Sequence, residues 1–237
     1  MDSGESHNTK GREEIMEKKC GRLFFIGGSL LATFALWTVL VRFVDVQAIG
    51  PEGSSVGFAV LNGFVHELIG VNWFLYTVTD WLGLVPIAVV FGFAVFGFMQ
   101  WIKRKKLFQV DPSLLILGGF YLVVMAVYIL FEMVVINYRP TLIDGSLEAS
   151  YPSSTTMLVT CVMPTAMMQL AARMKNGVFK RCVMAVIVAF IAFMVIGRLV
   201  SGVHWITDMI GGALFSAGVV VLYRAVIRFC NHKFTKM

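Results

Sequence analysis

The apolar stretch WLGLVPIAVVFGFAVFGFMQW, residues 81–101, decides the fold class of this chain, because it contains no charged residue. An α-helix needs about 20 apolar residues to cross the hydrocarbon core of a bilayer. The stretch therefore predicts a membrane span, and Pro86 predicts a bend within it. On either side, five further runs of similar character predict spans at residues 23–44, 114–136, 156–173, 182–200 and 205–227.

The overall composition agrees with a chain that lies mostly within a bilayer. Hydrophobic residues make up 58% of the 237 residues, charged residues make up 14%, and the mean hydropathy is +0.79. An ordinary soluble domain is much less apolar. We expect an all-α, integral-membrane bundle of six transmembrane helices, formed by one domain over residues 23–237 and preceded by a flexible cytoplasmic tail over residues 1–22.

The basic residues predict the orientation of the bundle. Seventeen of the 20 Lys and Arg residues lie in the N-terminal tail, after the second and fourth spans, or at the C-terminal end. Such residues concentrate on the cytoplasmic side of a membrane, so both termini are expected there. The short loops favour a bacterial cytoplasmic membrane. The net charge of +6 then reflects topology and contact with anionic lipids rather than with nucleic acid. No pattern indicates an oligomeric state.

A shorter apolar segment lies between the first and second spans, on the predicted outer side. Residues 54–70, SSVGFAVLNGFVHELIG, place apolar side chains at helical spacing. This pattern predicts a helix that lies in the membrane interface. His66 is an accessory candidate for contact with a lipid headgroup, although a polar residue on the wet face of such a helix usually has no special role.

Polar residues interrupt the other segments that meet the outer surface. They lie in the loop between the third and fourth spans, at the start of the fourth, at the end of the fifth and at the start of the sixth, and they are Arg139, Ser153, Ser154, Thr155, Arg198, His204 and Asp208. Ionisable groups at membrane depth are costly and usually functional. We expect these side chains to form one pocket. The alternative is that His204 and Asp208 only tie two spans together.

The residue types in this pocket point to phosphate chemistry. A spacing of four residues places His204 and Asp208 on one face of a helix. A carboxylate that accepts the Nδ1 proton of an imidazole leaves Nε2 free as a nucleophile. Arginines match phosphoryl oxygens, and amides at a helix start favour an anion. No cofactor is needed, and a metal site is not expected, because the arginines would repel a divalent cation.

Three ordered motifs add a family resemblance. The segment RLVSGVHWITD, 198–208, fits R-x5-H-x3-D, the segment YRP, 138–140, fits the end of K-x6-R-P, and PSST, 152–155, stands where P-S-G-H is expected. The chain resembles the type 2 phosphatidic acid phosphatase superfamily over roughly residues 80–225. Membrane members of that superfamily share a six-helix core with acid phosphatases and vanadium haloperoxidases.

The resemblance implies a role for each matching residue. His204 attacks phosphorus to give a phosphohistidine, and Asp208 orients it. Arg139, Arg198 and the amides of Ser153 and Ser154 hold the phosphoryl oxygens. Water then hydrolyses the intermediate, and no metal is required.

Four residues depart from the family pattern. Glu132 stands where a lysine is usual, about 10 Å deeper along a helix than Arg139. Gly197 replaces a serine, and Ser154 replaces a glycine. Thr155 stands where the family has a histidine that protonates the leaving oxygen. Loss of a general acid costs about 10²- to 10⁴-fold in rate, so the sequence predicts an impaired enzyme.

Two interpretations of Thr155 remain open. The natural enzyme either acts on a substrate with a good leaving group or takes the proton from another residue, for which His66, Glu148 and Tyr151 are candidates. Alternatively, threonine replaces a natural histidine.

The resulting hypothesis is a lipid phosphate or diphosphate phosphatase that acts at the outer leaflet. Polyprenyl diphosphate, phosphatidylglycerophosphate and phosphatidate are the candidate substrates, and the lipid bilayer is the expected partner. A non-catalytic lipid-phosphate binder or transporter is the first alternative, favoured by Thr155 and Glu132. A lipid phosphotransferase that uses the same phosphohistidine is the second.

Overall fold

The computed structural model describes the backbone of residues 3–234 and the side chains of residues 16–230. The helices are α1 (Ser3–Phe43), α2 (Ala59–Ile69), α3 (Trp73–Leu82), α4 (Leu84–Arg104), α5 (Pro112–Met133), α6 (Ser154–Arg173), α7 (Val178–Val200) and α8 (Ile206–Phe234), with short 3-10 turns η1 (Pro51–Gly53) and η2 (Leu107–Gln109). Within residues 3–234 the only β pairing is three isolated bridges. The all-α fold class is therefore confirmed.

Six helical segments are long and apolar enough to cross a membrane, as predicted. They are Met16–Phe43, Trp73–Arg104, Pro112–Met133, Ser154–Arg173, Val178–Val200 and Ile206–Cys230. The first belongs to a helix that starts at Ser3, so most of the predicted tail over residues 1–22 is helical. The flexibility of that tail stays a prediction.

The second span starts earlier than predicted, because α3 leads directly into α4. Pro86, inside α4, lacks the amide proton that would donate to the carbonyl of Leu82, and the helix is interrupted at the neighbouring Gly83. Helix α3 ends at Leu82, Gly83 joins the two helices, and α4 begins at Leu84. A Cβ atom built on Gly83 would lie 3.6 Å from Cγ2 of Thr155, so the junction rests on the start of α6.

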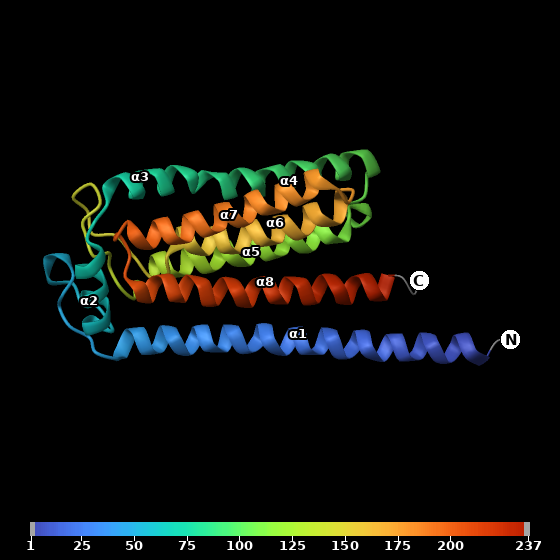
Figure 1. The fold of residues 1–237 in the computed structure, drawn as a ribbon, viewed down its shortest axis with the longest axis horizontal. Coiled ribbons are helices and arrows are strands. Elements are labelled where there is room, and N and C mark those ends of the chain that lie inside the picture. Colours follow the sequence, from blue (N-terminus) through green and yellow to red (C-terminus); the bar gives the residue numbers. More distant parts are fainter. Residues whose placement is uncertain (1–2, 235–237) are drawn as a thin grey trace.

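The helices form an elongated bundle, with α1 along one side and α3 and α4 along the other (Figure 1). Helix α6 is central and contacts α4, α5, α7 and α8. Half of its spanning window is buried, more than in any other span. Both termini lie at one end, and α2 lies across the opposite end. We call these the terminal end and the site end.

Helices α1 and α8 approach closely through two glycines. A Cβ atom on Gly27 would lie 2.7 Å from Cδ2 of Leu222, and one on Gly218 would lie 2.7 Å from Cδ2 of Leu31. Small residues allow membrane helices to pack at short distance, where van der Waals contact replaces the hydrophobic effect as the driving force. The two leucines fill the spaces that the glycines leave.

Helix α2 confirms that this segment is helical, although the helix is shorter than the predicted segment and begins at Ala59. Its position in the membrane interface stays a prediction. Val56 pairs with Gln47 in a β-bridge, which keeps the preceding chain extended. Gly57 contacts the end of α1 so closely that a Cβ atom would lie 1.6 Å from the carbonyl oxygen of Val41. Residues 54–58 therefore pack against the end of α1 and do not join the helix.

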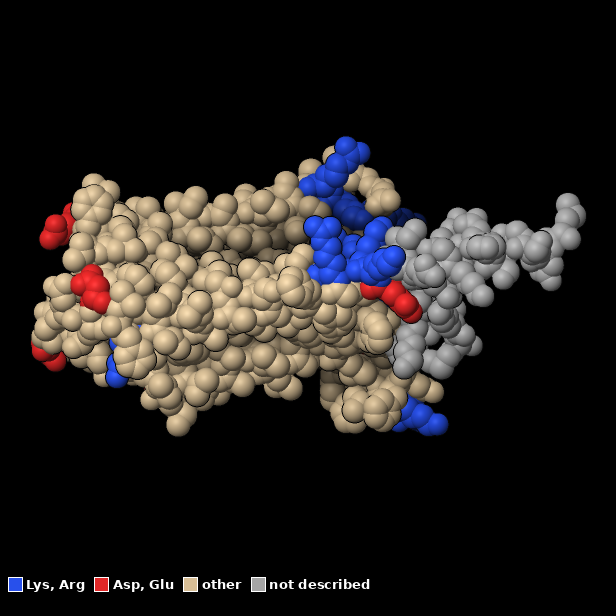
Figure 2. Space-filling view, turned by 90° about the horizontal axis from the view of Figure 1, so that it is seen from below, with Lys and Arg blue, Asp and Glu red and all other residues tan. Residues whose placement is uncertain are grey.

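Charge is distributed unevenly between the two ends of the bundle. Figure 2 shows most Lys and Arg side chains of the viewed face near the terminal end, while several acidic side chains lie at the site end. This is the asymmetry that the sequence predicts for a membrane protein with both termini on the cytoplasmic side.

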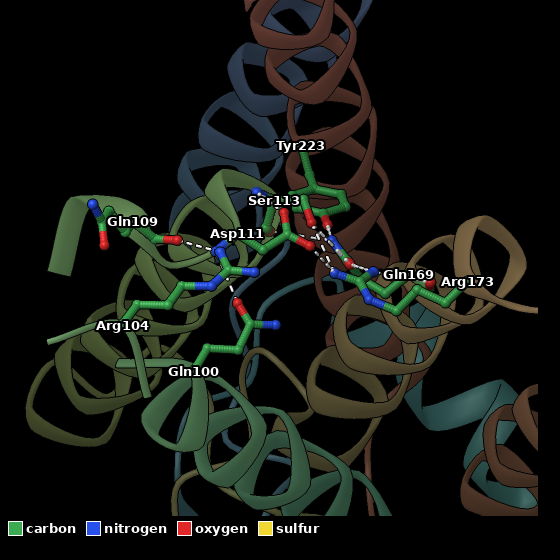
Figure 3. A network of polar contacts seen from close by, with 8 residues as sticks. All are labelled: Gln100, Arg104, Gln109, Asp111, Ser113, Gln169, Arg173 and Tyr223. Carbon is green, nitrogen blue, oxygen red and sulfur yellow. Dashed lines mark hydrogen bonds and ion pairs between the residues drawn. The ribbon is translucent and has the colours of Figure 1, made fainter. Parts of the chain in front are cut away.

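A polar network joins four spans near the terminal end (Figure 3), and Gln169 of α6 lies at its centre. Nη2 of Arg173 lies 2.6 Å from Oδ2 of Asp111, and the Gln169 amide donates to the backbone oxygen of Ser113 at 3.2 Å and also to the hydroxyl of Tyr223. Gln169 is 3% exposed and Tyr223 1% exposed. The network gives these buried polar groups hydrogen-bond partners, which the hydrocarbon of a bilayer could not provide.

Replacing Gln169 by alanine is expected to destabilise the bundle by about 1–3 kcal/mol, because it leaves buried partners unsatisfied. A lower midpoint of thermal unfolding in detergent would be the sign. Gln109→Ala is the matched control, since that side chain is exposed. Equal midpoints for the two variants would contradict the role of the network.

Candidate active site

The predicted site residues lie together at the site end of the bundle. Arg139 lies in the loop between α5 and α6, Arg198 in the last turn of α7, His204 in the loop before α8, and Asp208 in the first turn of α8. Their exposed fractions are 8%, 1%, 4% and 0% in that order. Four ionisable side chains are thus buried in one place. Burial of such groups costs free energy, so they are usually kept for a function.

His204 precedes α8, so the predicted placement of His204 and Asp208 on one helical face is wrong. The backbone N–H of Trp205 donates to Oδ2 of Asp208 at 3.1 Å, and this cap starts α8 after the histidine. Gly202 makes the turn before it, with φ of +68°. A Cβ atom there would lie 1.8 Å from the carbonyl oxygen of Gly70, so no larger residue fits.

Ser150 connects the histidine to the aspartate. Its hydroxyl donates to Oδ2 of Asp208 at 2.6 Å and lies 2.9 Å from Nδ1 of His204. The hydroxyl has one proton, which goes to the carboxylate, so its oxygen accepts the proton of Nδ1. Nε2 of His204 then carries no proton. The aspartate orients the imidazole through Ser150, and not by the direct contact that the sequence predicts.

A short antiparallel pairing places Ser150 and Arg139 in the site. The N–H of Arg139 donates to the carbonyl of Glu148 at 3.0 Å, and the N–H of Ser150 donates to that of Asn137 at 2.9 Å. The Asn137 side chain also donates to Oδ1 of Asp208 at 3.3 Å. In an extended chain, side chains two residues apart share a face, which brings Asn137 and Arg139 to the same side.

The environment keeps His204 neutral. Burial lowers the pKa of His204 well below its ordinary value, and the positive charges of Arg139 and Arg198 lower it further, while a hydrogen bond with the backbone of Ser150 acts in the opposite direction. Nη1 of Arg139 lies 3.4 Å from Nε2. The imidazole therefore presents an unprotonated nitrogen beside a guanidinium group at neutral pH.

Each buried arginine has a carboxylate beside it. Nε of Arg139 lies 3.1 Å from Oε2 of Glu148, and Nη1 of Arg198 lies 3.6 Å from Oδ1 of Asp80. Both carboxylates are substantially exposed, at 43% and 57%. Among the described side chains, neither Nε has a hydrogen-bond acceptor of suitable geometry. Buried guanidinium groups with free donors are suited to bind an anion.

The start of α6 contributes amides and a hydroxyl. The N–H of Ser153 is occupied by the carbonyl of Asp208 at 3.1 Å, and its hydroxyl donates to Oγ1 of Thr156 at 3.0 Å. Ser154 and Thr155 begin the helix, where amides lack partners within the helix and the dipole favours negative charge. Ser154 therefore fits the predicted donor role better than Ser153 does.

A cavity of about 410 Å³ leads from the site into the bundle between α4, α5 and α6. Asp80, Ser154 and Thr155 line its polar end, and its other residues are mostly apolar, reaching Val90 and Val162. Its shape and lining suit a hydrocarbon chain joined to a charged group.

The accessory candidates lie around this centre. Glu132 lines a small pocket with Ser150 and Tyr151, and the described side chains show no ion pair between Glu132 and an arginine. The ring of His66 lies 5.4 Å from that of Trp205, next to His204 in the chain. Burial lowers the pKa of His66. Within residues 16–230 there is no group of three or more His, Cys, Asp or Glu side chains that could hold a metal ion.

Sequence reasoning missed Asp80, Asn137 and Ser150. The latter two lie on an irregular loop, and only the pairing across residues 138 and 149 reveals their register. Asp80 lies one residue before the predicted second span, and no motif or spacing in the sequence associates it with Arg198. Tyr151, one candidate proton donor, faces away from the site, because its hydroxyl lies 2.7 Å from Oγ1 of Thr38 in the core.

Comparison with known proteins gives a consistent result. Residues 134–231 match the family model described as the PAP2 superfamily. The fold is similar to that of a crystal structure described as the first transmembrane PAP2 type phosphatidylglycerolphosphate phosphatase from Bacillus subtilis. The TM-score is 0.53 at 19% sequence identity, with 84% of this chain and 94% of that chain covered. No curated protein matches the chain. The part of the chain that contains Arg139, Arg198 and His204 is therefore similar to the PAP2 superfamily.

Proposed function

We propose that this chain is an integral-membrane lipid phosphatase that removes phosphate through a phosphohistidine on His204. The observation that carries the proposal is the state of the imidazole. Ser150 holds the proton on Nδ1, burial keeps the ring neutral, and Nε2 lies 3.4 Å from the Arg139 guanidinium. A nucleophile with a free lone pair beside a cation is what attack on a phosphate requires.

The remaining groups bind the phosphoryl oxygens. Arg139 and Arg198 each provide a buried Nε that has no hydrogen-bond acceptor of suitable geometry among the described side chains, and the first amides of α6 add a positive helix end. Asp208 and Ser150 hold the histidine. Negative charge that develops on phosphorus and its oxygens is neutralised by these fixed donors, so the reaction needs no metal.

The cavity between α4, α5 and α6 supports a lipid substrate. Its lining includes Asp80, which lies 3.6 Å from Arg198, and most of its other residues are apolar. Phosphatidate, phosphatidylglycerophosphate and a polyprenyl diphosphate all combine such a chain with a terminal phosphate. The gathering of basic residues at the terminal end favours a cytoplasmic position for both termini and a site at the outer leaflet of the cell membrane.

The first experiment is phosphate release by the purified protein from these three lipids in mixed micelles. We expect release from at least one, together with a radiolabelled phosphohistidine that can be trapped by acid-free quenching. Saturable binding of all three lipids without any release would favour a binder or transporter. That alternative is favoured by Thr155, and by the two carboxylates that lie against the arginines.

A phosphotransferase would form the same intermediate and pass the phosphoryl group to an acceptor other than water. Mass spectrometry of the products separates the two reactions. Hydrolysis predicts free phosphate in an amount equal to the dephosphorylated lipid, while transfer predicts a newly phosphorylated acceptor in its place.

Ser150→Ala is expected to lower kcat about 10- to 100-fold with little change in KM. The substitution removes the hydroxyl that fixes the imidazole and leaves the buried Asp208 with one donor fewer, a loss of about 1.5–3 kcal/mol for a hydrogen bond to a charged group. Ser146→Ala, in the exposed part of the same loop, is the control. A Ser150→Ala enzyme with unchanged kcat would contradict the relay.

A further inference from the structure

The proposed reaction needs a proton donor close to the oxygen atom that leaves with the lipid. When phosphorus is transferred to His204, the oxygen that leaves is the one attached to the lipid. If the hydrocarbon chain lies in the cavity between α4, α5 and α6, that oxygen lies at the polar end of the cavity, which Asp80, Ser154 and Thr155 form. A threonine or serine hydroxyl is too weak an acid to protonate an alkoxide at neutral pH.

Asp80 is the one carboxyl group among the residues that line this cavity. It lies in the last turn of α3, three residues before Gly83, where a Cβ atom would lie 3.6 Å from Cγ2 of Thr155. Its Oδ1 is 3.6 Å from Nη1 of Arg198, so it borders the group proposed to bind phosphate.

Other titratable groups near the cavity are less suitable. The hydroxyl of Tyr121 lies 3.1 Å from Oγ1 of Thr165, deeper in the bundle. Tyr128 also lines the cavity, but a phenol is a much weaker acid than a carboxyl group. Glu148 lies against Arg139 and does not line the cavity.

We propose that Asp80 is the general acid and general base of this site, in the place where the family resemblance leads one to expect a histidine at Thr155. The proposal rests on the proposed function. In the first step Nε2 of His204 bonds to phosphorus, the bond between phosphorus and the lipid oxygen breaks with its electron pair on oxygen, and Asp80 gives its proton to that oxygen.

In the second step the Asp80 carboxylate takes a proton from water while the water oxygen bonds to phosphorus. The phosphorus–nitrogen bond breaks, its electron pair returns to Nε2, and Asp80 ends the cycle protonated, as it began.

The test compares Asp80→Asn on two substrates that differ in their leaving groups. A lipid phosphate monoester leaves as a strongly basic alkoxide, whereas p-nitrophenyl phosphate leaves as a weakly basic phenolate that needs no acid. We expect kcat/KM to fall about 100-fold or more for the lipid and to change less than about threefold for p-nitrophenyl phosphate. The ratio kcat/KM reports only the steps up to departure of the leaving group.

Three further variants complete the design. Glu148→Gln neutralises the other carboxylate beside a buried arginine, and we expect its effect to be the same on both substrates. Asp144→Asn changes an exposed loop residue at the site end and serves as the neutral control. Thr155→His alone should gain less than about tenfold, but in the Asp80→Asn background it should recover most of the lost lipid activity.

Equal losses on both substrates would overturn the proposal, because they would mean that Asp80 acts only through Arg198. A gain of about 100-fold for Thr155→His in the presence of Asp80 would also overturn it, because it would show that the site lacks a donor. Absence of phosphate release from p-nitrophenyl phosphate and from every lipid would instead reject the proposed function itself. Asp80 is exposed and asparagine has nearly its shape, so the substitution leaves the fold intact.

Discussion

Replacing His204 by glutamine is expected to lower kcat/KM for phosphate release by about 10⁴-fold or more, the effect of removing a nucleophile. Glutamine has similar size and can still accept a hydrogen bond from Arg139, but it cannot form the covalent intermediate. The radiolabelled phosphoprotein should disappear in the variant, while binding of the lipid phosphate should persist, because Arg139 and Arg198 remain.

His66→Gln is the matched control for this experiment. His66 lies at the same end of the bundle, against Trp205, and shows no hydrogen bond to a site residue within the described part of the chain. We expect less than about a threefold change in kcat/KM, within the range of a surface substitution. A phosphoprotein that survives in His204→Gln and is lost in His66→Gln would reverse the assignment of the nucleophile.

The second large effect is expected from Arg198→Ala, which should lower kcat/KM by about 10²- to 10³-fold, as removal of a fixed donor to a developing negative charge does. Arg198 is 1% exposed and lies with its guanidinium 4.9 Å from the ring of Tyr76. The variant loses the positive charge and all three donor nitrogens of the guanidinium group. Arg198→Lys keeps the charge without the planar fork, so it should recover only part of the loss.

Arg42→Ala controls for loss of a positive charge at the site end, because that arginine is exposed in the last turn of α1. Thermal unfolding of each variant in detergent separates a local effect from loss of the fold. If Arg198→Ala released phosphate as fast as Arg42→Ala while remaining folded, the proposal that Arg198 binds phosphate would be wrong.

The membrane architecture was predictable because each span is a long apolar run, and length alone distinguishes such a run from a soluble helix. The segment over residues 205–227 coincides closely with α8, and helix α2 was found from its helical spacing. The start of the second span was missed by eight residues, because Asp80 and the residues around it are less uniformly apolar than the stretch that follows.

The residues that gather in the candidate site were predictable from the order of the motifs. The contacts that depend on loop conformation were not predictable. Arg139, Arg198 and His204 converge because three segments reach the same end of the bundle. The link through Ser150 depends instead on how a loop pairs with itself, and on a helix that starts after His204. Short-range spacing cannot reveal either feature, since both result from contacts between distant segments.

The junction between α3 and α4 has a consequence for how such chains are classified. The matched family region, residues 134–231, contains the proposed nucleophile and both arginines, whereas Gly83 and Asp80 lie outside it. A survey confined to that region would record a threonine in place of a histidine and label the protein a pseudoenzyme. If a residue of a neighbouring span supplies that proton, the site has every group that the reaction needs. The label would then be wrong, because the comparison covers only part of the site.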